Sequence, residues 1–232
     1  MTFLVPSLLS CDHCSIWSTV EPLLRARHVH RIHFDVMDGK FVPNFGFSPQ
    51  LLRDFDGHVR ASQLPRPSFD VHLMVHNPED IWPFFWRVGA DAITFHGECC
   101  PDPAALARNL RPIGLRCGLA LSPGSSLDIV SSCGAFFDEL LLLGVPPGFG
   151  GQPADDGLVE RVAQAVQLRR KKFFSFAIAV DGGVGPATIG ALAAAGMEVP
   201  IAGSALFCSD DAVRTFDAME KIFGERRLPD PR

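Results

Sequence analysis

The chain has 232 residues, 47% of them hydrophobic, which is enough for one large domain or two small ones with an ample core. Its formal net charge of -5 gives no electrostatic case for binding nucleic acid. No apolar run approaches the roughly 20 residues that a membrane span needs, and the N-terminus lacks the basic and apolar segments of a signal peptide.

The 7 cysteines are scattered, and their odd number argues against a complete disulfide framework. Cys11 and Cys14 form a C-x-x-C pair, but no second pair follows at zinc-ribbon spacing. We interpret this pair as chance or as packing at a helix start. A reducing, cytoplasmic compartment is the simpler expectation.

Apolar, strand-like runs alternate with segments of helical spacing along the whole chain. Strands are expected at residues 3–9, 31–36, 69–75, 91–96, 116–121, 136–143, 174–180 and 198–202. Helices are expected at residues 15–27, 49–55, 78–88, 103–110, 125–132, 155–170, 186–195 and 210–223, with a polar link at 57–68.

This alternation predicts the fold class. Strict β-α alternation indicates a parallel sheet, and continuous apolar strands indicate a sheet covered on both faces. Eight units in this length fit a single-domain (β/α)8 TIM barrel over residues 1–232, since such barrels have about 250 residues. An open doubly wound sheet is the alternative, but it usually carries a glycine-rich turn where Ser7–Ser10 lies here.

One histidine and one carboxylate stand out at the end of the second expected strand. His33 and Asp35 alternate and therefore share a face, and Gly39 and Pro43 break the chain into a loop directly afterwards. Taken alone, a His-x-Asp pair is more often a hydrogen-bonded pair than a metal site. The other strand ends make function the better interpretation, because active sites of such barrels gather there. These ends carry Ser7, Met37, His72, Met74, His96, Asp181 and several glycines.

The glycines follow the last three expected strands, at residues 148–151, 182–183 and 203. Glycine-rich loops let backbone N–H groups approach an anion, and barrels of this kind usually bind phosphate after strands seven and eight. No lysine or arginine lies in these loops, so backbone amides are expected to bind a phosphorylated substrate. Any one of these loops could instead be a simple helix-entry turn.

His33, Asp35, His72 and Asp181 come from three strands and could converge on one point. Two imidazoles and two carboxylates suit a divalent ion such as Zn, Mn, Co or Fe(II). Two carboxylates on opposite sides of a substrate can act as base and acid, and a metal would stabilise an enediolate. The set predicts epimerisation or isomerisation of a sugar phosphate.

At this point the chain resembles the ribulose-phosphate 3-epimerase family, from Pro6 to about Asp211. The matching stretches are residues 6–10, 33–44, 70–74, 147–152, 180–184 and 202–207. The combination is far more specific than any single stretch. Members of this family interconvert D-ribulose 5-phosphate and D-xylulose 5-phosphate in the pentose phosphate pathway, and a homo-oligomer is expected.

The resemblance implies a role for each matched residue. The metal ligands would be His33, Asp35, His72 and Asp181, with Asp35 and Asp181 as the two acid/base groups. Ser7 and His72 would contact the sugar, and Met37 and Met74 would wall the enediolate unless they are plain core. The phosphate-binding residues would be Gly148, Phe149, Gly150, Gly151, Gly182, Gly183, Gly203 and Ser204.

The chain departs from the family pattern at several places. Leu143 replaces a usual methionine, Pro146 replaces Asn or Asp, the segment at residues 153–156 is shorter and more acidic, and Ser48 replaces a common glycine. Relatives acting on allulose 6-phosphate can have serine at that last position. The choice of sugar therefore stays open: another ketose phosphate, such as allulose 6-phosphate or a tetrulose phosphate, is the alternative. A non-catalytic sugar-phosphate-binding homologue is the alternative from a different class.

Overall fold

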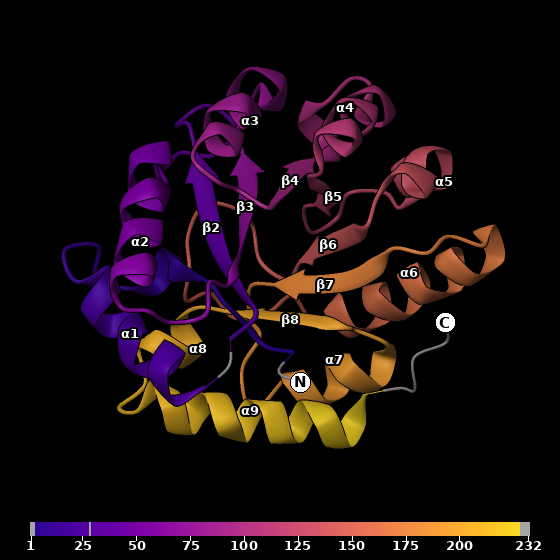
Figure 1. Ribbon diagram of the computed structural model, residues 1–232. Helices are drawn as coiled ribbons and strands as arrows, with labels where there is room; N and C mark the ends of the chain where they lie inside the picture. Colours follow the sequence, from indigo (N-terminus) through magenta and orange to yellow (C-terminus); the bar gives the residue numbers. More distant parts are fainter. Residues whose placement is uncertain (1–2, 28, 228–232) are drawn as a thin grey trace.

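The computed structural model describes residues 3–27 and 29–227, which form a barrel of parallel strands surrounded by helices (Figure 1). The strands are β1 Val5–Pro6, β2 Arg31–Met37, β3 Ser68–Met74, β4 Ala92–His96, β5 Arg116–Leu121, β6 Glu139–Leu143, β7 Ala177–Asp181 and β8 Val199–Ala202. The helices are α1 Ile16–Ala26, α2 Pro49–Ala61, α3 Pro78–Arg87, α4 Pro103–Leu110, α5 Asp128–Cys133, α6 Leu158–Lys172, α7 Ile189–Ala195, α8 Ser204–Phe207 and α9 Ala212–Arg226.

The strands are ordered β1-β8-β7-β6-β5-β4-β3-β2, and every pair is parallel. A parallel bridge between Ser7 and His33 joins the two ends of this order. The predicted (β/α)8 TIM barrel is therefore confirmed. Among the described residues, no helix is both long enough and apolar enough to cross a bilayer.

Side-chain alternation along the strands creates two separate cores. Outward-facing residues such as Phe34, Phe69 and Phe95 are buried between the sheet and the helices. Inward-facing residues of five strands fill the middle of the barrel: Val5, Ala120, Leu141, Leu143, Ala179 and Ile201. On β2 and β3 the inward positions are instead polar, which is unusual for a buried layer. His33, Asp35, Asp70 and His72 are each at most 3% exposed there.

Many boundaries differ from the prediction by a few residues, and the short helix α8 was not predicted; three of the differences have a clear physical reason or bear on the site. The first strand is only Val5–Pro6, because Leu8–Ser10 forms a 3-10 turn after Ser7. Helix α2 continues to Ala61 through Gly57, since Val59 extends the buried stripe of Leu52 and Phe55 by one turn. Strand β7 ends at Asp181, so this residue is the last strand residue and not the first residue of the loop.

Candidate active site

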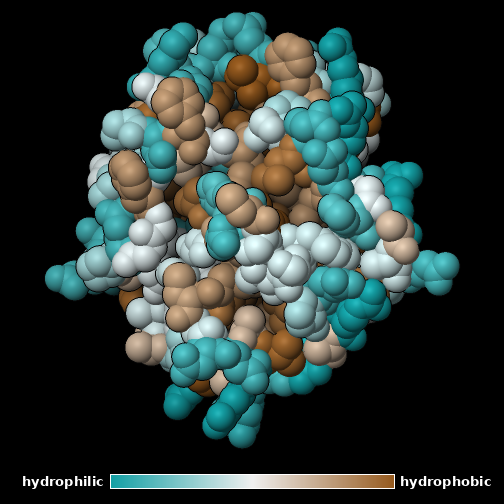
Figure 2. All heavy atoms as spheres, turned by 90° about the vertical axis from the view of Figure 1, so that its left-hand side faces the viewer, coloured by the Kyte–Doolittle hydropathy of each residue, from teal (hydrophilic) through white to brown (hydrophobic). Residues whose placement is uncertain are grey.

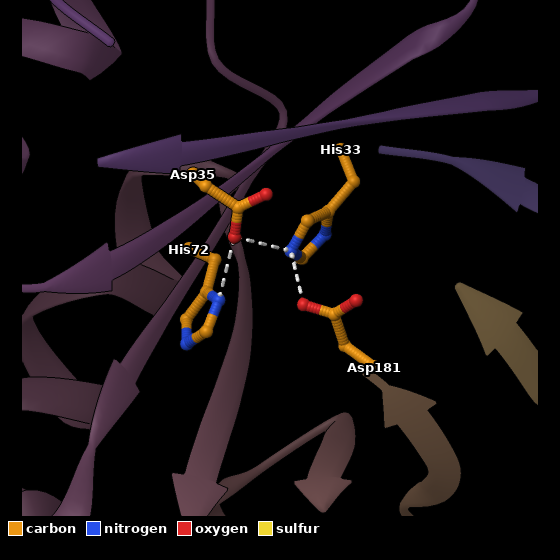
Figure 3. Close-up of side chains that lie close together, drawn as sticks. All are labelled: His33, Asp35, His72 and Asp181. Atoms are coloured by element: carbon orange, nitrogen blue, oxygen red, sulfur yellow. Dashed lines mark hydrogen bonds and ion pairs between the residues drawn. The ribbon is translucent and has the colours of Figure 1, made fainter. Parts of the chain in front are cut away.

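Three strands deliver four ligand-type side chains to the carboxyl end of the barrel (Figure 3). His33 and Asp35 come from β2, His72 comes from the adjacent β3, and Asp181 ends β7 across the barrel. One ligand atom from each of these residues lies within 4.8 Å of the other three. The structure thus brings the whole predicted quartet together, and rigid strands hold every member.

The quartet suits a cation. Both ring nitrogens of His33 are buried without a hydrogen-bond partner among the described residues, which is rare for buried polar atoms. Its Nε2 lies 3.4 Å from Asp35 Oδ1 and 3.8 Å from Asp181 Oδ2. Ligands of one metal are about 3–4 Å apart when each metal–ligand bond is about 2.0–2.2 Å. These donors therefore fit a divalent metal in both type and spacing.

The two carboxylates have opposite electrostatic surroundings. Burial alone would raise the pKa of Asp35, but His33 opposes it most strongly, and this pKa lies well below its usual range. The hydroxyl of Ser7 also donates to Asp35 Oδ2 at 2.7 Å. Burial and the Asp35 charge raise the pKa of Asp181 above its usual range, although His33 opposes them. Carboxyl groups whose pKa values are pushed apart are typical of an acid–base pair.

The two histidines of the quartet have opposite pKa shifts. Burial would lower the pKa of His33, but Asp35 and then Asp181 and Asp70 raise it to about 9. A proton on His33 therefore compensates the carboxylates when no metal does. His72, whose Nδ1 lies 3.1 Å from Asp35 Oδ1, has its pKa lowered mainly by burial.

His96 and Glu98 extend the site beyond the quartet, and the sequence analysis assigned neither of them a role. His72 Nε2 lies 3.0 Å from His96 Nε2, and His96 Nδ1 lies 3.1 Å from Glu98 Oε2. Burial lowers the pKa of His96. Burial would raise the pKa of Glu98, but hydrogen bonds from His96 and Ser125 lower it to about 2. The sequence signal that could have indicated this pair is the H-x-E spacing of His96 and Glu98 at the end of β4.

A pocket opens next to the quartet and encloses about 550 Å³ of empty space, solvent at its mouth included. The predicted site residues that line it are Ser7, Asp35, Met74, Gly148, Phe149, Gly150, Gly151, Asp181, Gly182, Gly183, Gly203 and Ser204. His33 and His72 are not part of its lining, and Met37 packs against Met74 and Val42. Figure 2 shows the face toward which β7 points, with hydrophobic side chains in the recesses and hydrophilic ones along the outer edge.

The glycine loops pack closely around this pocket. Gly182 and Gly183 have φ values of +87° and +70°, which side chains other than glycine rarely adopt. A Cβ atom on Gly183 would lie 2.4 Å from Cβ of Ala154 in the loop after β6. That loop is in turn held by Asn44, whose Nδ2 donates to the carbonyl of Gly148 at 2.7 Å. Sequence reasoning gave Asn44 no role of its own.

The part of the pocket that the structure describes lacks cationic side chains that could bind an anion. No lysine or arginine lies among the described residues that line it. An anion bound there would be held by backbone N–H groups and by hydroxyls such as those of Ser10 and Ser204, since the Ser7 hydroxyl already donates to Asp35. This arrangement agrees with the predicted mode of phosphate binding.

The comparisons with known proteins decide the family. The profile of the Ribulose-phosphate 3 epimerase family matches residues 3–207. The chain belongs to the ribulose-phosphate 3-epimerase family. It is 37% identical over 204 residues to the ribulose-phosphate 3-epimerase of Treponema pallidum, with 88% of this chain and 90% of that protein covered. It is 32% identical over 222 residues to a protein of Oryza sativa subsp. japonica named ribulose-phosphate 3-epimerase, cytoplasmic isoform, with 94% and 92% covered.

A solved structure of 3-hexulose-6-phosphate synthase from Salmonella typhimurium has a TM-score of 0.69. It covers 98% of this chain and all of that one, but only 16% of the residues are identical, so it supports the fold alone. The resemblance seen in the sequence is confirmed, and so is the prediction that the chain is an enzyme of the epimerase family.

The departures from the family pattern fall in different places. Leu143 and Pro146 both line the pocket beside the glycine loops. Ser48 instead lies at the start of α2, where its hydroxyl accepts a hydrogen bond from the Leu51 amide. An N-cap role explains serine at that position without reference to the substrate.

Proposed function

We propose that the protein is a metal-dependent 3-epimerase that interconverts D-ribulose 5-phosphate and D-xylulose 5-phosphate. The main support is the pair Asp35 and Asp181, two carboxyl groups with opposite pKa shifts that line the same pocket. Inversion at a carbon centre needs one group to remove a proton and a second group to return one from the opposite face.

Each carboxyl group has one part in this reaction. Asp35, ionised, accepts the C3 proton, and the electrons of the C–H bond move toward the C2 carbonyl to give an enediolate. Asp181, protonated, then donates its proton to C3 from the other face. In the reverse direction the two exchange roles. The hydroxyl of Ser7 holds Asp35 by donating to Oδ2, which leaves Oδ1 directed at the quartet.

The quartet of His33, Asp35, His72 and Asp181 would hold the cation. When bound, a divalent ion such as Zn, Fe(II), Mn or Co would stabilise the negative charge that develops on the substrate oxygens. Met74 lines the same pocket and would exclude water from the planar intermediate, with Met37 packed behind it.

The loops after β6, β7 and β8 would bind the phosphate through backbone amides. Their glycines line the pocket, and no lysine or arginine is among the described residues that line it. A ketose phosphate bound by these loops would reach the carboxyl pair with its C3 between Asp35 and Asp181.

The pocket wall bears on which sugar is bound. Leu143 and Pro146 alter the lining near the glycine loops, so another ketose phosphate, such as allulose 6-phosphate or a tetrulose phosphate, is the second candidate. The intact carboxyl pair argues against a non-catalytic sugar-phosphate-binding homologue. We further propose that the protein acts in the pentose phosphate pathway and forms a homo-oligomer. We also propose a cytoplasmic location, which the name of the rice relative supports. Light scattering and cell fractionation test the last two.

Proton exchange at C3 tests the proposal directly. In D₂O, the metal-replete enzyme should exchange the C3 proton of D-ribulose 5-phosphate and form xylulose 5-phosphate, both followed by NMR. A chelator should stop both, and added metal should restore them. Exchange with allulose 6-phosphate or a tetrulose phosphate only would overturn the choice of sugar, and no exchange with any ketose phosphate would overturn the activity.

A further inference from the structure

Behind the quartet, His96 and Glu98 continue a row of side chains that starts at His72, and the proposed reaction uses neither of these two residues directly. His72 Nδ1 faces Asp35 Oδ1 at 3.1 Å, and on the other side of the ring His72 Nε2 faces His96 Nε2 at 3.0 Å. His96 Nδ1 then faces Glu98 Oε2 at 3.1 Å. Both histidine side chains are fully buried, so water cannot replace these contacts.

Glu98 determines the direction of every hydrogen bond in this row. An ionised carboxylate can only accept, so His96 Nδ1 must carry a hydrogen. A neutral His96 then has a bare Nε2, which can only accept from His72 Nε2–H. A neutral His72 that carries its hydrogen on Nε2 has a bare Nδ1, and this lone pair faces the quartet.

Hydrogen bonds hold the carboxylate of Glu98 in place. The second carboxylate oxygen of Glu98, Oε1, accepts from the backbone N–H of Ser122 at 2.7 Å and also from the hydroxyl of Ser125. Both donors point at the same oxygen, so Oε2 is left for His96. The ring of Phe41 packs against His96 with a centroid distance of 4.7 Å, which limits its rotation.

We propose that Glu98 and His96 are positioning residues that hold His72 in the tautomer able to ligate a metal through Nδ1. This inference rests on the proposed metal site. It explains why two acceptor atoms, Nδ1 of His72 and Oδ1 of Asp35, lie 3.1 Å apart in a buried place. A cation between two such acceptors turns their repulsion into coordination. When a histidine binds a metal through one ring nitrogen, mutation of the residue that hydrogen-bonds its other ring nitrogen commonly lowers metal affinity by about 10–100-fold.

The isosteric change Glu98→Gln tests the direction of the hydrogen bonds between Glu98, His96 and His72. A glutamine amide has one oxygen and one NH₂ group. If its oxygen accepts from Ser122, its NH₂ group faces His96 and demands the opposite tautomer, which places a hydrogen on His72 Nδ1. Titration of the apoprotein with Co²⁺, followed by visible absorption, should show a dissociation constant about 10–100-fold higher than that of the wild type. The control Glu79→Gln removes the same charge from the exposed first turn of α3 and should bind Co²⁺ like the wild type.

Two variants of His96 test separately whether His72 Nε2–H needs a hydrogen-bond acceptor. Gln and Met have similar length, but only Gln can place an oxygen near His72 Nε2–H. His96→Gln should therefore bind Co²⁺ more tightly than His96→Met, although both remove the imidazole. Melting curves of the apoproteins show which variants are folded before the titrations are compared.

The outcomes separate this inference from the proposed function. A wild-type protein that binds no Co²⁺ at the quartet would overturn the metal site and this inference with it. A wild-type protein that binds Co²⁺, together with a folded Glu98→Gln variant of equal affinity and equal spectrum, would overturn the positioning role alone. Equal affinities of the His96→Gln and His96→Met variants would also contradict it.

Discussion

Asp35 and Asp181 carry the same functional group, and only their surroundings make them different. Asp35 faces His33 and the Ser7 hydroxyl, both of which favour its ionised form. Asp181 lies opposite an existing negative charge in a buried place, which favours its protonated form. The sequence cannot show this difference, because the groups that cause it lie on β2, on β7 and directly after β1.

Removal of one carboxyl group should separate proton exchange from epimerisation. The Asp181→Asn variant should epimerise about 10²–10⁴-fold more slowly, because it lacks the second acid/base group. Asp35 should still remove and return the C3 proton on its own face, so one epimer should exchange with D₂O without inversion. NMR of each epimer in D₂O measures this, with metal content checked in parallel.

The reciprocal variant is the control for this prediction. Asp35→Asn should slow epimerisation by a similar factor and confine any residual exchange to the other epimer. Near-wild-type epimerisation by Asp181→Asn, or equal exchange of both epimers in it, would contradict the two-carboxyl mechanism.

A negative charge in the phosphate region should weaken substrate binding. In Ser204→Glu, the new carboxylate lies at the pocket wall and should repel a phosphate group, raising KM at least about tenfold, which is about 1.4 kcal/mol. Steady-state kinetics measure this change. Ser132→Glu places the same charge on exposed helix α5 and should leave KM unchanged. An equal KM in both variants would refute the phosphate assignment.

At the scale of the elements, strands β2 and β3 carry polar side chains at both ends of the barrel. The amino-terminal end holds an ion network: Arg31 bonds Asp70 and lies 2.8 Å from Glu139, and Arg116 Nη2 lies 2.6 Å from Asp70. His33 and His72 occupy the next inward positions on the same strands. The alternation that places the metal ligands therefore also places charges, which need partners in a buried layer.

Asp70→Asn should show how much of the stability this network supports. Asp70 is 3% exposed, and its loss removes the carboxylate partner of Arg116 and one of the two carboxylates that face Arg31, which keeps Glu139; this should cost about 3 kcal/mol. In a chain of this size the melting midpoint should fall by about 6–12 °C, while kcat stays close to the wild-type value. Calorimetry and kinetics measure the two effects.

Asp217→Asn provides the comparison for this network. It breaks the partly exposed pair of Asp217 with Arg27 on the outside of the barrel and should change the midpoint very little. Similar shifts in the two variants would mean that burial adds nothing to the Asp70 network.

The fold was predictable because its signals are local. Apolar strands and segments of helical spacing alternate eight times along the chain, and proline begins α2, α3 and α4. The boundaries that were missed depend on tertiary contacts. Val59 extends α2 because it packs into the core, and the first strand stops at Pro6 because the Ser7 side chain binds Asp35 and begins a turn.

The candidate site was predictable to the same extent. Its four ligand-type residues lie at strand ends, which the sequence marks, and the family resemblance then supplies their roles. Glu98 was missed because its relation to His72 runs through His96 and exists only once β3 and β4 are adjacent. The ion network below the site was missed for the same reason, since Arg31, Arg116 and Glu139 meet only inside the closed barrel.

At the scale of the whole molecule, the proposed metal would connect strands on opposite sides of the barrel. The quartet draws ligands from β2, β3 and β7, so the unfolded chain does not hold them together. An ion that binds only the native state should stabilise it by about 2.7 kcal/mol at a concentration 100 times its dissociation constant. Zn²⁺ or Co²⁺ should then raise the melting midpoint of the apoprotein by about 5–10 °C in calorimetry.

The variant His33→Phe decides whether this stabilisation comes from the quartet. A phenyl ring fills the place of the imidazole but removes one ligand, and with it the positive charge that faces Asp35 and Asp181 in the apoprotein. The apo variant should therefore melt somewhat below the apo wild type, and its midpoint should not rise when metal is added. An equal rise in both proteins would place the bound ion elsewhere in the molecule. A rise in the wild type alone would show that the four side chains act as one metal site and support the native barrel when it is filled.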